Sequence, residues 1–416
     1  MNITHHTVTH NQNFTGYDAR RLKGLLVTDK ACAEALKKLT PTTELDIFTP
    51  QIASKSIRKE AFELEKNNKL IWTQDYFTIL QNHILFDNTR DFLKRTLRAT
   101  SDGIAKQINK IPFKSEPHLR GGNFFICQVG DKKKLIVDET RLIYPKELFK
   151  QIYNVDEVCP IAKTDYHIDL SIRPLENGNV LVADNRLTKK MLQTGQEKLN
   201  KYITENNLNE SNKKEIENII EQLSNHEKKL DITLEFEPQK SLKNTQKIIQ
   251  QLNDYGFNPI PVPATYHYLE ESAINKKANI EKFNNSLTEL KEYSKGQSKT
   301  FQVYAQNYIN LMSLKPKVDF HCGTELVNIY QNNFINAIVN KTNNGKINYI
   351  TNASLLDKEL GITPEIEAKT GFSTRKAFEE SIAPYVDKFI TIDEKLTERL
   401  FKYMGGIHCT ASEIPM

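Results

Sequence analysis

The sequence lacks most of the features that place a chain in a class at first sight. No stretch approaches 18 consecutive apolar residues, so no membrane-spanning helix is expected. The opening residues, MNITHHTVTHNQNF, show no charged segment followed by an apolar one, as a secretory signal would. We therefore expect a protein that stays in the cytoplasm or is exported without a signal peptide.

Cysteines are also few, and none forms a CxxC pair. The five are scattered along the chain, at Cys32, Cys127, Cys159, Cys322 and Cys409. Their odd number and wide spacing argue for reduced thiols, against a disulfide framework and against a structural zinc site. A net charge of +5 over 416 residues is small, so charge gives no case for nucleic-acid binding.

What is present indicates a globular α/β protein. The 38% hydrophobic and 26% charged residues suit one large core or two moderate ones. Short apolar strands joined by turns alternate with helical stretches, as in Asn123–Val129, its hairpin partner 134–138 and the helix Tyr144–Tyr153. Asp29–Leu39 is a candidate short helix within an otherwise mixed region, so residues 1–45 are interpreted as an N-terminal extension.

Two polar helical segments interrupt this alternation, at about 187–235 and 270–298. The first is rich in Lys, Glu and Asn and breaks near 205–211, which predicts a helical hairpin inserted into the main fold. The main catalytic domain is thus predicted to span 46–416. The insertions could be solvated helices without a catalytic role, or could contact other proteins.

Cys409 is the strongest candidate for a reactive group. It follows Gly405-Gly406-Ile407-His408, and an apolar Gly-Gly-Ile-His-Cys in a terminal segment is unusual unless it docks into a site. The two glycines allow close backbone approach, and a nearby cation can turn the thiol into the nucleophilic thiolate. A buried, inert cysteine is the alternative, and His321-Cys322-Gly323 is a rival His-Cys pair.

Two other segments supply polar groups of matching chemistry. His167–Ile172 is predicted to be a strand, so His167 and Asp169 should face the same side, as a proton carrier and a carboxylate. Trp72-Thr73-Gln74-Asp75 places the only tryptophan near a carboxylate, a pairing that suits a planar cation. Two alternatives remain open for the pair His167 and Asp169, namely a polar strand edge facing the surface or a pair of metal ligands. For the segment with Trp72, the alternative is a core tryptophan beside an aspartate that caps a helix.

Arg120-Gly121-Gly122-Asn123 precedes a predicted strand, where paired glycines let the backbone approach a ligand or simply form a turn. Taken together, these segments offer a thiol, an imidazole and two carboxylates. That set suits attack on a cationic carbon such as the centre of a guanidinium group.

The order WxxD, GGN, HxD and a C-terminal GGIHC resembles the guanidine-modifying (pentein) superfamily of agmatine, arginine and protein-arginine deiminases and amidinotransferases. The resemblance covers roughly residues 70–416. It implies a pentein-type five-bladed α/β propeller, built from ββαβ units around one central cleft, with helical segments inserted. It departs from agmatine and arginine deiminases at Arg120, where they carry Glu.

By this resemblance, Cys409 attacks the guanidinium carbon while Asp75 and Asp169 hold its nitrogens. His167 protonates the departing ammonia and then activates water against the thiouronium intermediate. No metal or other cofactor is implied, and no EF-hand loop is present. The implied substrate-binding residues are Trp72, Arg120, Gly121, Gly122, Asn123, Gly406 and His408.

The predicted function is therefore a hydrolase that converts an arginine-type guanidinium to a ureido group plus ammonia. Gln74, Arg120 and the large insertions favour arginine in a protein or peptide as the partner. The alternatives are an agmatine or free-arginine deiminase, an amidinotransferase, and a catalytically silent pentein-like binding protein.

Overall fold

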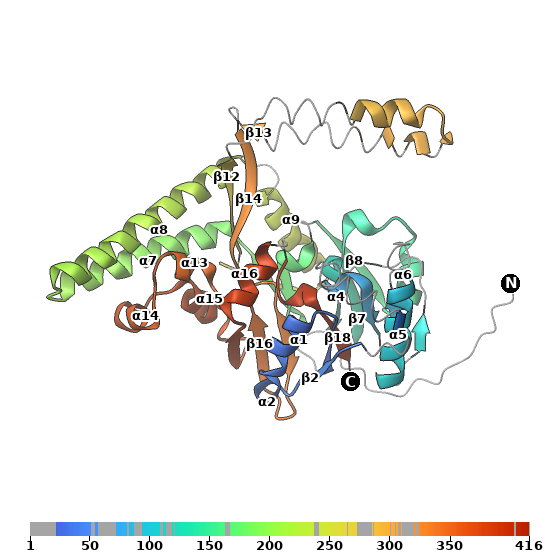
Figure 1. The fold of residues 1–416 in the computed structure, drawn as a ribbon, viewed down its shortest axis with the longest axis horizontal. Coiled ribbons are helices and arrows are strands. Elements are labelled where there is room, and N and C mark those ends of the chain that lie inside the picture. The colour runs from blue at the N-terminus through green and yellow to red at the C-terminus, as the bar shows by residue number, and fades with distance from the viewer. Residues whose placement is uncertain are drawn as a thin grey trace.

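The structure is a computed structural model of mixed α/β class (Figure 1). It describes residues 22–50, 55–56, 72–80, 83–86, 94–108, 111–113, 119, 121–162, 167–236, 241–263, 265–272, 285, 287–299, 301–303, 305–306, 309, 320–321, 324–402 and 405–415. Among these residues, no helix combines the length and apolarity needed to cross a membrane.

Five three-stranded sheets repeat one topology. In each, the first strand pairs antiparallel with the second, the chain continues through one or more helices, and a third strand pairs parallel with the second. The first unit consists of β3 (Phe77–Ile79), β4 (His83–Phe86), α5 (Lys94–Ile108) and β5 (Ile111–Phe113). The second consists of β6 (Phe124–Val129), β7 (Lys132–Asp138), α6 (Lys146–Tyr153) and β8 (Glu157–Ile161).

The third and fourth units carry longer helical connections. The third consists of β9 (Ile172–Pro174), β10 (Asn179–Ala183), α7 (Asn185–Glu205), α8 (Glu210–Phe236), α9 (Ser241–Asp254) and β11 (Asn258–Val262). The fourth consists of β15 (Ile338–Lys341), β16 (Ile347–Thr351), α13 (Leu355–Glu359), α14 (Pro364–Thr370), α15 (Thr374–Ile382) and β17 (Lys388–Thr391).

The fifth unit is assembled from both ends of the described chain. Its first strand is β18 (Ala411–Pro415), and its remaining elements are β1 (Leu22–Val27), α1 (Lys30–Lys37), α2 (Thr40–Thr43) and β2 (Asp46–Phe48). The helix α16 (Glu394–Lys402) leads from the fourth unit toward β18. Arg399 on α16 binds both carboxylate oxygens of Asp29, at 2.9 and 2.6 Å, and so fastens the two ends together.

Helix boundaries follow the capping chemistry of the sequence. The side chain of Asp29 accepts a hydrogen bond from the backbone N–H of Cys32, and Ser354, Thr363 and Ser373 cap α13, α14 and α15 in the same way. The helix α14 ends at Gly371, whose φ of 69° lies in the left-handed region that glycine adopts without strain.

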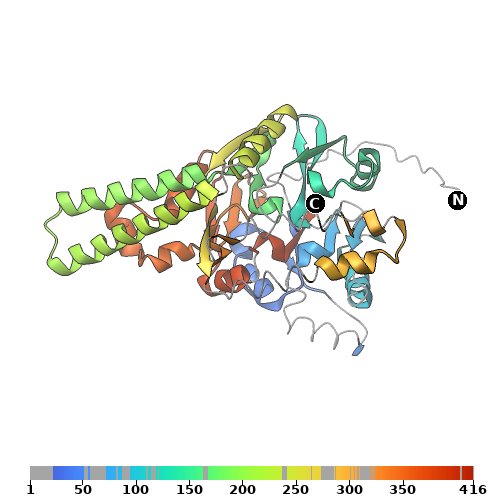
Figure 2. The ribbon, with the colours of Figure 1, turned by 90° about the horizontal axis from the view of Figure 1, so that it is seen from above.

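Apolar side chains of neighbouring units share five buried clusters, which close the units into a ring. Around the ring these clusters join Leu85 to Leu135, Cys127 to Val180, Leu181 to Val339, Ile338 to Leu25, and Leu26 to Ile84. Each unit therefore packs on the one before and the one after it. Figure 2 shows the chain from above. The predicted five-bladed α/β propeller is confirmed by this repeated, closed arrangement.

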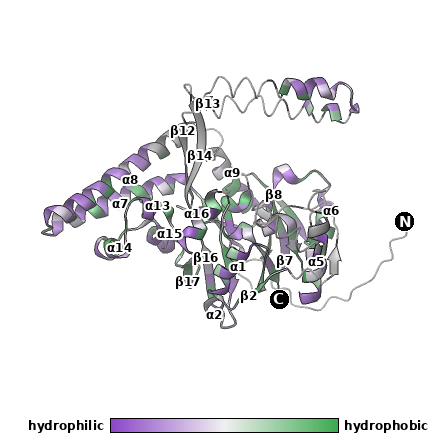
Figure 3. Cartoon of the chain, viewed as in Figure 1, coloured by the Kyte–Doolittle hydropathy of each residue, from purple (hydrophilic) through white to green (hydrophobic). Residues whose placement is uncertain are grey.

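The first predicted insertion is a helical hairpin, formed by α7 and α8 between β10 and β11. It projects well beyond the sheets (Figure 1), and hydrophilic residues dominate its surface (Figure 3). Its base is nonetheless anchored, because Leu192, Leu199 and Leu223 pack with Leu356 and Phe372 of the fourth unit. Gly195 makes this contact possible, since a Cβ there would lie 2.3 Å from the ring of Phe372.

The second predicted insertion is only partly helical. Its first residues belong to β12 (Thr265–Ser272), which pairs with β14 (Thr324–Asn333) in a sheet that also contains β13 (Phe320–His321). Residues 287–294 are helical, and 273–284 lie outside the described residues. The expectation of a helical segment from 270 onward is therefore wrong at its N-terminal end, where backbone pairing with β14 extends the chain.

The predicted domain boundary at 45/46 falls inside the fifth unit, between α2 and β2. Residues of β1 form the centre of that sheet, paired with β18 on one side and β2 on the other. We propose that the catalytic domain includes Leu22–Met416, with only the residues before Leu22 left as an extension.

The interface between the fourth and fifth units should contribute strongly to stability. Leu25 is fully buried there, beside Ile338. Leu25→Ala should lower the free energy of unfolding by about 2–5 kcal/mol, because it removes buried carbons and leaves a cavity. Urea denaturation would measure this, with the exposed Ile143→Ala as a control expected to change stability by less than about 0.5 kcal/mol. Equal effects of the two substitutions would contradict a tightly packed ring closure.

Candidate active site

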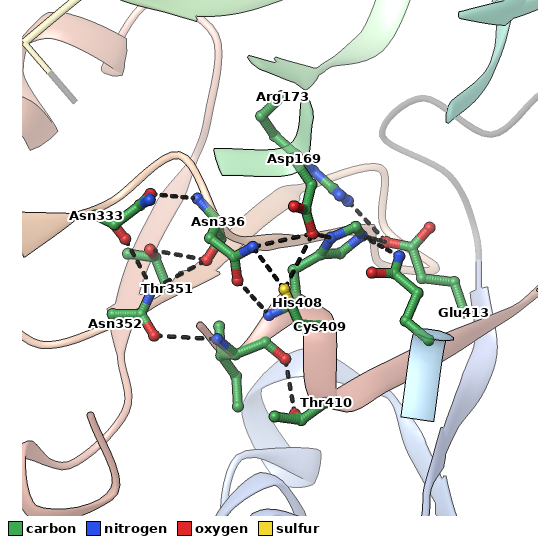
Figure 4. Close-up of polar contacts among 12 residues, drawn as sticks. Asp169, Arg173, Asn333, Asn336, Thr351, Asn352, His408, Cys409, Thr410 and Glu413 are labelled. Carbon is green, nitrogen blue, oxygen red and sulfur yellow. Dashed lines mark hydrogen bonds and ion pairs between the residues drawn. The ribbon is translucent and has the colours of Figure 1, made fainter. Parts of the chain in front are cut away.

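A short turn precedes the first strand of every unit, and these turns lie close together. Figure 4 shows side chains of three of them, Asp169, Asn336 and Cys409, pointing toward one another. We call them the entry turns: α4 (Thr73–Tyr76), η1 (Gly121–Asn123), η3 (Ile168–Leu170), residues 333–337, and η5 (His408–Thr410). The first contacts the second and the last, and the second contacts the third. The propeller thus gathers the polar segments that are far apart in the sequence.

Cys409 lies at the centre of this meeting point and is only 7% exposed. Its thiol donates a hydrogen bond to Oδ2 of Asp169 at 3.2 Å. Nδ2 of Asn336 donates to its sulfur, also at 3.2 Å. Burial raises the pKa of the Cys409 thiol well above its usual value, and the negative charge of Asp169 raises it further. Without a cation nearby, the group is therefore a thiol rather than a thiolate.

Asp169 is buried and its two oxygens have different environments. Oδ2 accepts hydrogen bonds from Asn336 Nδ2 at 3.0 Å, His408 Nδ1 at 2.9 Å and the Cys409 thiol. Burial alone would raise the pKa of this carboxyl, but the hydrogen bonds that Oδ2 accepts, above all the one from His408, outweigh burial and hold the pKa below its usual value. Oδ1 has no hydrogen-bond partner among the described residues.

His408 connects Asp169 to Gln74 and Phe125. Burial lowers the pKa of its imidazole, and the charge of Arg173 lowers it further, so the ring is neutral. Nδ1 donates to Asp169, which leaves Nε2 to accept from Nε2 of Gln74 at 3.0 Å. The ring also stacks on Phe125, with centroids 5.5 Å apart. These contacts fix both the orientation and the tautomer of His408.

Arg173 and Glu413 form a largely buried ion pair next to His408. Nη2 of Arg173 donates to Oε1 of Glu413 at 2.7 Å, and its guanidinium lies 5.3 Å from the centroid of Phe125. Glu413 Oε1 is 3.8 Å from His408 Nε2. Residues of β3, β6 and β18 also line a small pocket here, which reaches Gln74, His408 and Glu413 but not Cys409.

His167 comes from the same turn as Asp169, but the predicted strand is wrong. Ile168–Leu170 form a 3-10 turn, and β9 starts only at Ile172. The buried Ile168 packs in the core between the second and third units, and its packing favours a turn that sends both polar neighbours toward the site. His167 lies against Gly122, where a Cβ would come within 2.2 Å of its Nδ1. The pair Gly121-Gly122 is thus required by close packing.

The remaining predicted residues surround this centre. The half-buried Trp72 packs against Gly405, whose added Cβ would lie 2.5 Å from the indole ring. Gly406 lies against Asn336, with a corresponding distance of 2.5 Å to Oδ1. Asn123 is buried, and neither polar atom of its amide has a hydrogen-bond partner within the described part of the chain.

Two predicted residues and the rival cysteine cannot be placed. The backbone of Asp75 belongs to α4, but its side chain is not described. Arg120 and Cys322 lie outside the described residues. The structure therefore brings together Cys409, His408, Asp169 and His167, and it places Trp72, Gly121, Gly122, Asn123 and Gly406 around them.

Sequence reasoning missed the asparagines that support the nucleophile. Asn336 contacts both Cys409 and Asp169, and its Oδ1 accepts from the backbone N–H of His408 at 2.8 Å. Asn352 accepts from the N–H of Ile407 at 3.0 Å, and Asn333 accepts from the N–H of Asn336 at 3.0 Å. The available signal was Asn333 and Asn336 just before a strand, at the place where the other units carry their polar turns.

No group of three or more His, Cys, Asp or Glu side chains suited to a metal ion occurs among the described residues. The chemistry that these residues offer is instead that of a buried thiol beside an ionised carboxylate. The carboxylate oxygen Oδ1 and the imidazole of His167 are the other polar groups at hand.

The chain matches no protein-family model, and no curated protein sequence is similar to it. Its structure is similar to that of C. jejuni agmatine deiminase, with 11% identity and a TM-score of 0.45, over 98% of this chain and 99% of that one. It is also similar to the N-terminal domain of ArgZ, an arginine dihydrolase of cyanobacteria, with 9% identity and a TM-score of 0.38, over 94% and 88% of the chains.

A third similarity is to DDAH from Pseudomonas aeruginosa, with 11% identity and a TM-score of 0.28, over 39% of this chain and 70% of that one. Because these identities are low and the TM-scores are below 0.5, the fold assignment rests on the five closed ββαβ units. The chemistry rests on the residues gathered at the entry turns.

Proposed function

We propose that this protein is a guanidine-modifying hydrolase, which converts a guanidinium group to a ureido group and ammonia. The observation that carries the proposal is the pairing of Cys409 with Asp169. A thiol lies within hydrogen-bond reach of a buried, ionised carboxylate whose other oxygen has no hydrogen-bond partner among the described residues. A buried anion of this kind calls for a cation with N–H donors.

Each group then has a role in the proposed reaction. The guanidinium donates to Oδ1 of Asp169 and to the carboxylate of Asp75, which hold it beside the sulfur. The thiol gives its proton to His167, and a bond forms between sulfur and the guanidinium carbon. His167 returns the proton to the departing nitrogen, which leaves as ammonia, and then takes a proton from the water that attacks the thiouronium carbon. Collapse of that adduct breaks the carbon–sulfur bond and releases the ureido product. The sulfur takes up the hydroxyl proton of the adduct, which restores the thiol, and His167 releases the proton that it took from water to the solvent.

The electrostatics of the site favour attack only when substrate is bound. The free thiol has a raised pKa because it is buried and lies near the charge of Asp169. A guanidinium between the two would neutralise that charge and lower the pKa of the thiol, since an opposite charge close by favours the ionised form. The substrate would thus activate its own nucleophile, and the resting enzyme would keep a protected, poorly reactive sulfur.

We further propose that the group is the side chain of arginine in a protein or peptide, with agmatine or free arginine as the alternative. Trp72, Arg120, Gly121, Gly122, Asn123 and Gly406 would line the substrate site, and His408 would act by holding Asp169. Gln74 supports this site from below, through its bond to His408. An amidinotransferase would use the same residues, with an amine in place of water.

A colorimetric ureido assay would test the proposal on three substrates: an arginine-containing protein, agmatine and free arginine. We expect equal amounts of ureido product and ammonia from at least one of them, and the largest rate with the protein. Amidino transfer to an added amine without ureido product would favour the transferase. The absence of both reactions on all three substrates would overturn the proposed function.

A further inference from the structure

Among the described residues, Asn336 is the side-chain amide that hydrogen-bonds to both the sulfur and the carboxylate of the proposed site. It is fully buried in the turn before β15. Its two N–H bonds are both used, one toward Oδ2 of Asp169 at 3.0 Å and the other toward Sγ of Cys409 at 3.2 Å. No sequence motif pointed to this residue.

The orientation of the amide is determined by its surroundings. Asparagine oxygen and nitrogen are told apart by the hydrogen bonds that they make. Here the backbone N–H of His408, which is only a donor, faces the amide at 2.8 Å, so the atom that it meets is Oδ1. The amino group therefore points toward the sulfur.

The position of Asn336 is fixed as firmly as its orientation. Its own backbone N–H donates to Oδ1 of Asn333, and its carbonyl accepts from Nδ2 of Asn352 at 3.2 Å. Gly406 lies so close that any Cβ would come within 2.5 Å of Oδ1. A residue held this tightly presents its donor to the sulfur without a conformational search, which is the arrangement that stabilises developing charge best.

We propose that Asn336 is a catalytic residue of the guanidine-modifying reaction, a role that rests on the proposed function. Its N–H donates to Cys409 as the sulfur becomes a thiolate. When the thiol loses its proton, it also loses the bond that it donated to Asp169, and it then lies next to an anion. The N–H of Asn336 is the side-chain donor among the described residues that remains on the sulfur at that moment, beside a backbone hydrogen bond from Gly406, and its partner N–H keeps Asp169 in place.

The test uses the full-length protein with Asn336→Asp and Asn336→Ala. The first keeps the shape of the side chain but removes the donor, and the second removes the whole amide. The exposed Asn212→Asp on α8 serves as a control for the added charge. Circular dichroism and thermal unfolding would show which variants fold, so that the second remains informative if the first does not.

The first measurement is the pH dependence of Cys409 alkylation by iodoacetamide. Removing the donor should raise the pKa of the thiol by about one unit, so alkylation at pH 8 should slow about tenfold in Asn336→Ala and by more in Asn336→Asp, which also places a negative charge beside the sulfur. The control should behave as the unchanged protein does. An unchanged alkylation profile in a folded Asn336→Ala would overturn the proposal, because a merely structural role would not set the reactivity of the sulfur.

The second measurement is the split between kcat and KM with the best guanidinium substrate. We expect kcat to fall about a hundredfold in Asn336→Ala, as for the loss of one preorganised donor, with KM changed much less. An increase in KM alone would also count against the proposal. If no substrate is turned over by the unchanged protein, the proposed function fails, whereas the alkylation profile still decides the role of Asn336 toward the thiol.

Discussion

Ureido product should disappear when Cys409 is replaced by alanine. In the proposed reaction the substitution removes the atom that bonds to the guanidinium carbon, and water alone is a poor substitute for it. We expect kcat/KM to fall by about a thousandfold or more, at least 4 kcal/mol of transition-state stabilisation. The fold should persist, because the substitution removes one sulfur atom rather than a large core side chain.

The rival His-Cys pair supplies the matched control. Cys322→Ala should retain most of the activity, since Cys409 is the cysteine that the structure places beside Asp169. Mass spectrometry of the protein trapped with substrate would give a second readout, with the adduct on a peptide that contains Cys409. Loss of activity in Cys322→Ala together with activity in Cys409→Ala would refute the assignment.

Replacing Asp169 by asparagine should have two effects of opposite sign. Turnover should fall by about a thousandfold, because the guanidinium loses a buried charged partner. The thiol should nevertheless become easier to ionise. Burial, the larger cause of its raised pKa, is unchanged, but the negative charge that adds to it is gone. At pH 8, alkylation of Cys409 should therefore be about tenfold faster than in the unchanged protein.

The sign of this second effect separates the electrostatic explanation from simple damage to the site. The fraction of thiolate rises with pH, equals one half at the pKa of the thiol and levels off above it. The alkylation profile of Asp169→Asn should thus be shifted to lower pH, whereas that of the Asn336 variants should be shifted to higher pH. A slower alkylation in Asp169→Asn, or retained turnover, would contradict the proposed role of the carboxylate.

The sequence predicted which polar residues meet at this site better than it predicted the local structure that holds them. His408, Cys409 and Asp169 do meet, although a strand was expected where a 3-10 turn holds His167 and Asp169. An apolar residue between two polar ones has the period of a strand, and this local pattern cannot distinguish a strand from a turn with a buried central residue. The tertiary packing of Ile168 decides between them.

Other parts of the structure depend on non-local contacts and could not be predicted in this way. The pairing of β1 with β18 joins opposite ends of the described chain, so residues 22–45 looked like an extension when considered alone. The role of Asn336 could not be predicted from the sequence for a different reason. Asparagine is frequent in this sequence and suits many turns, so only its distance to Cys409 distinguishes it.

The way in which the ring closes also bears on how the protein is made. The sheet that carries the turn of Cys409 needs β1, which leaves the ribosome early, and β18, which leaves it last of the described strands. Contacts of such large sequence separation form slowly, and the first four units can fold before the fifth is complete. The nascent chain would therefore carry no assembled thiol–carboxylate pair. On the proposed function, the thiol could attack guanidinium groups only after the five-bladed propeller has closed. An incomplete chain would therefore not modify arginine side chains near it.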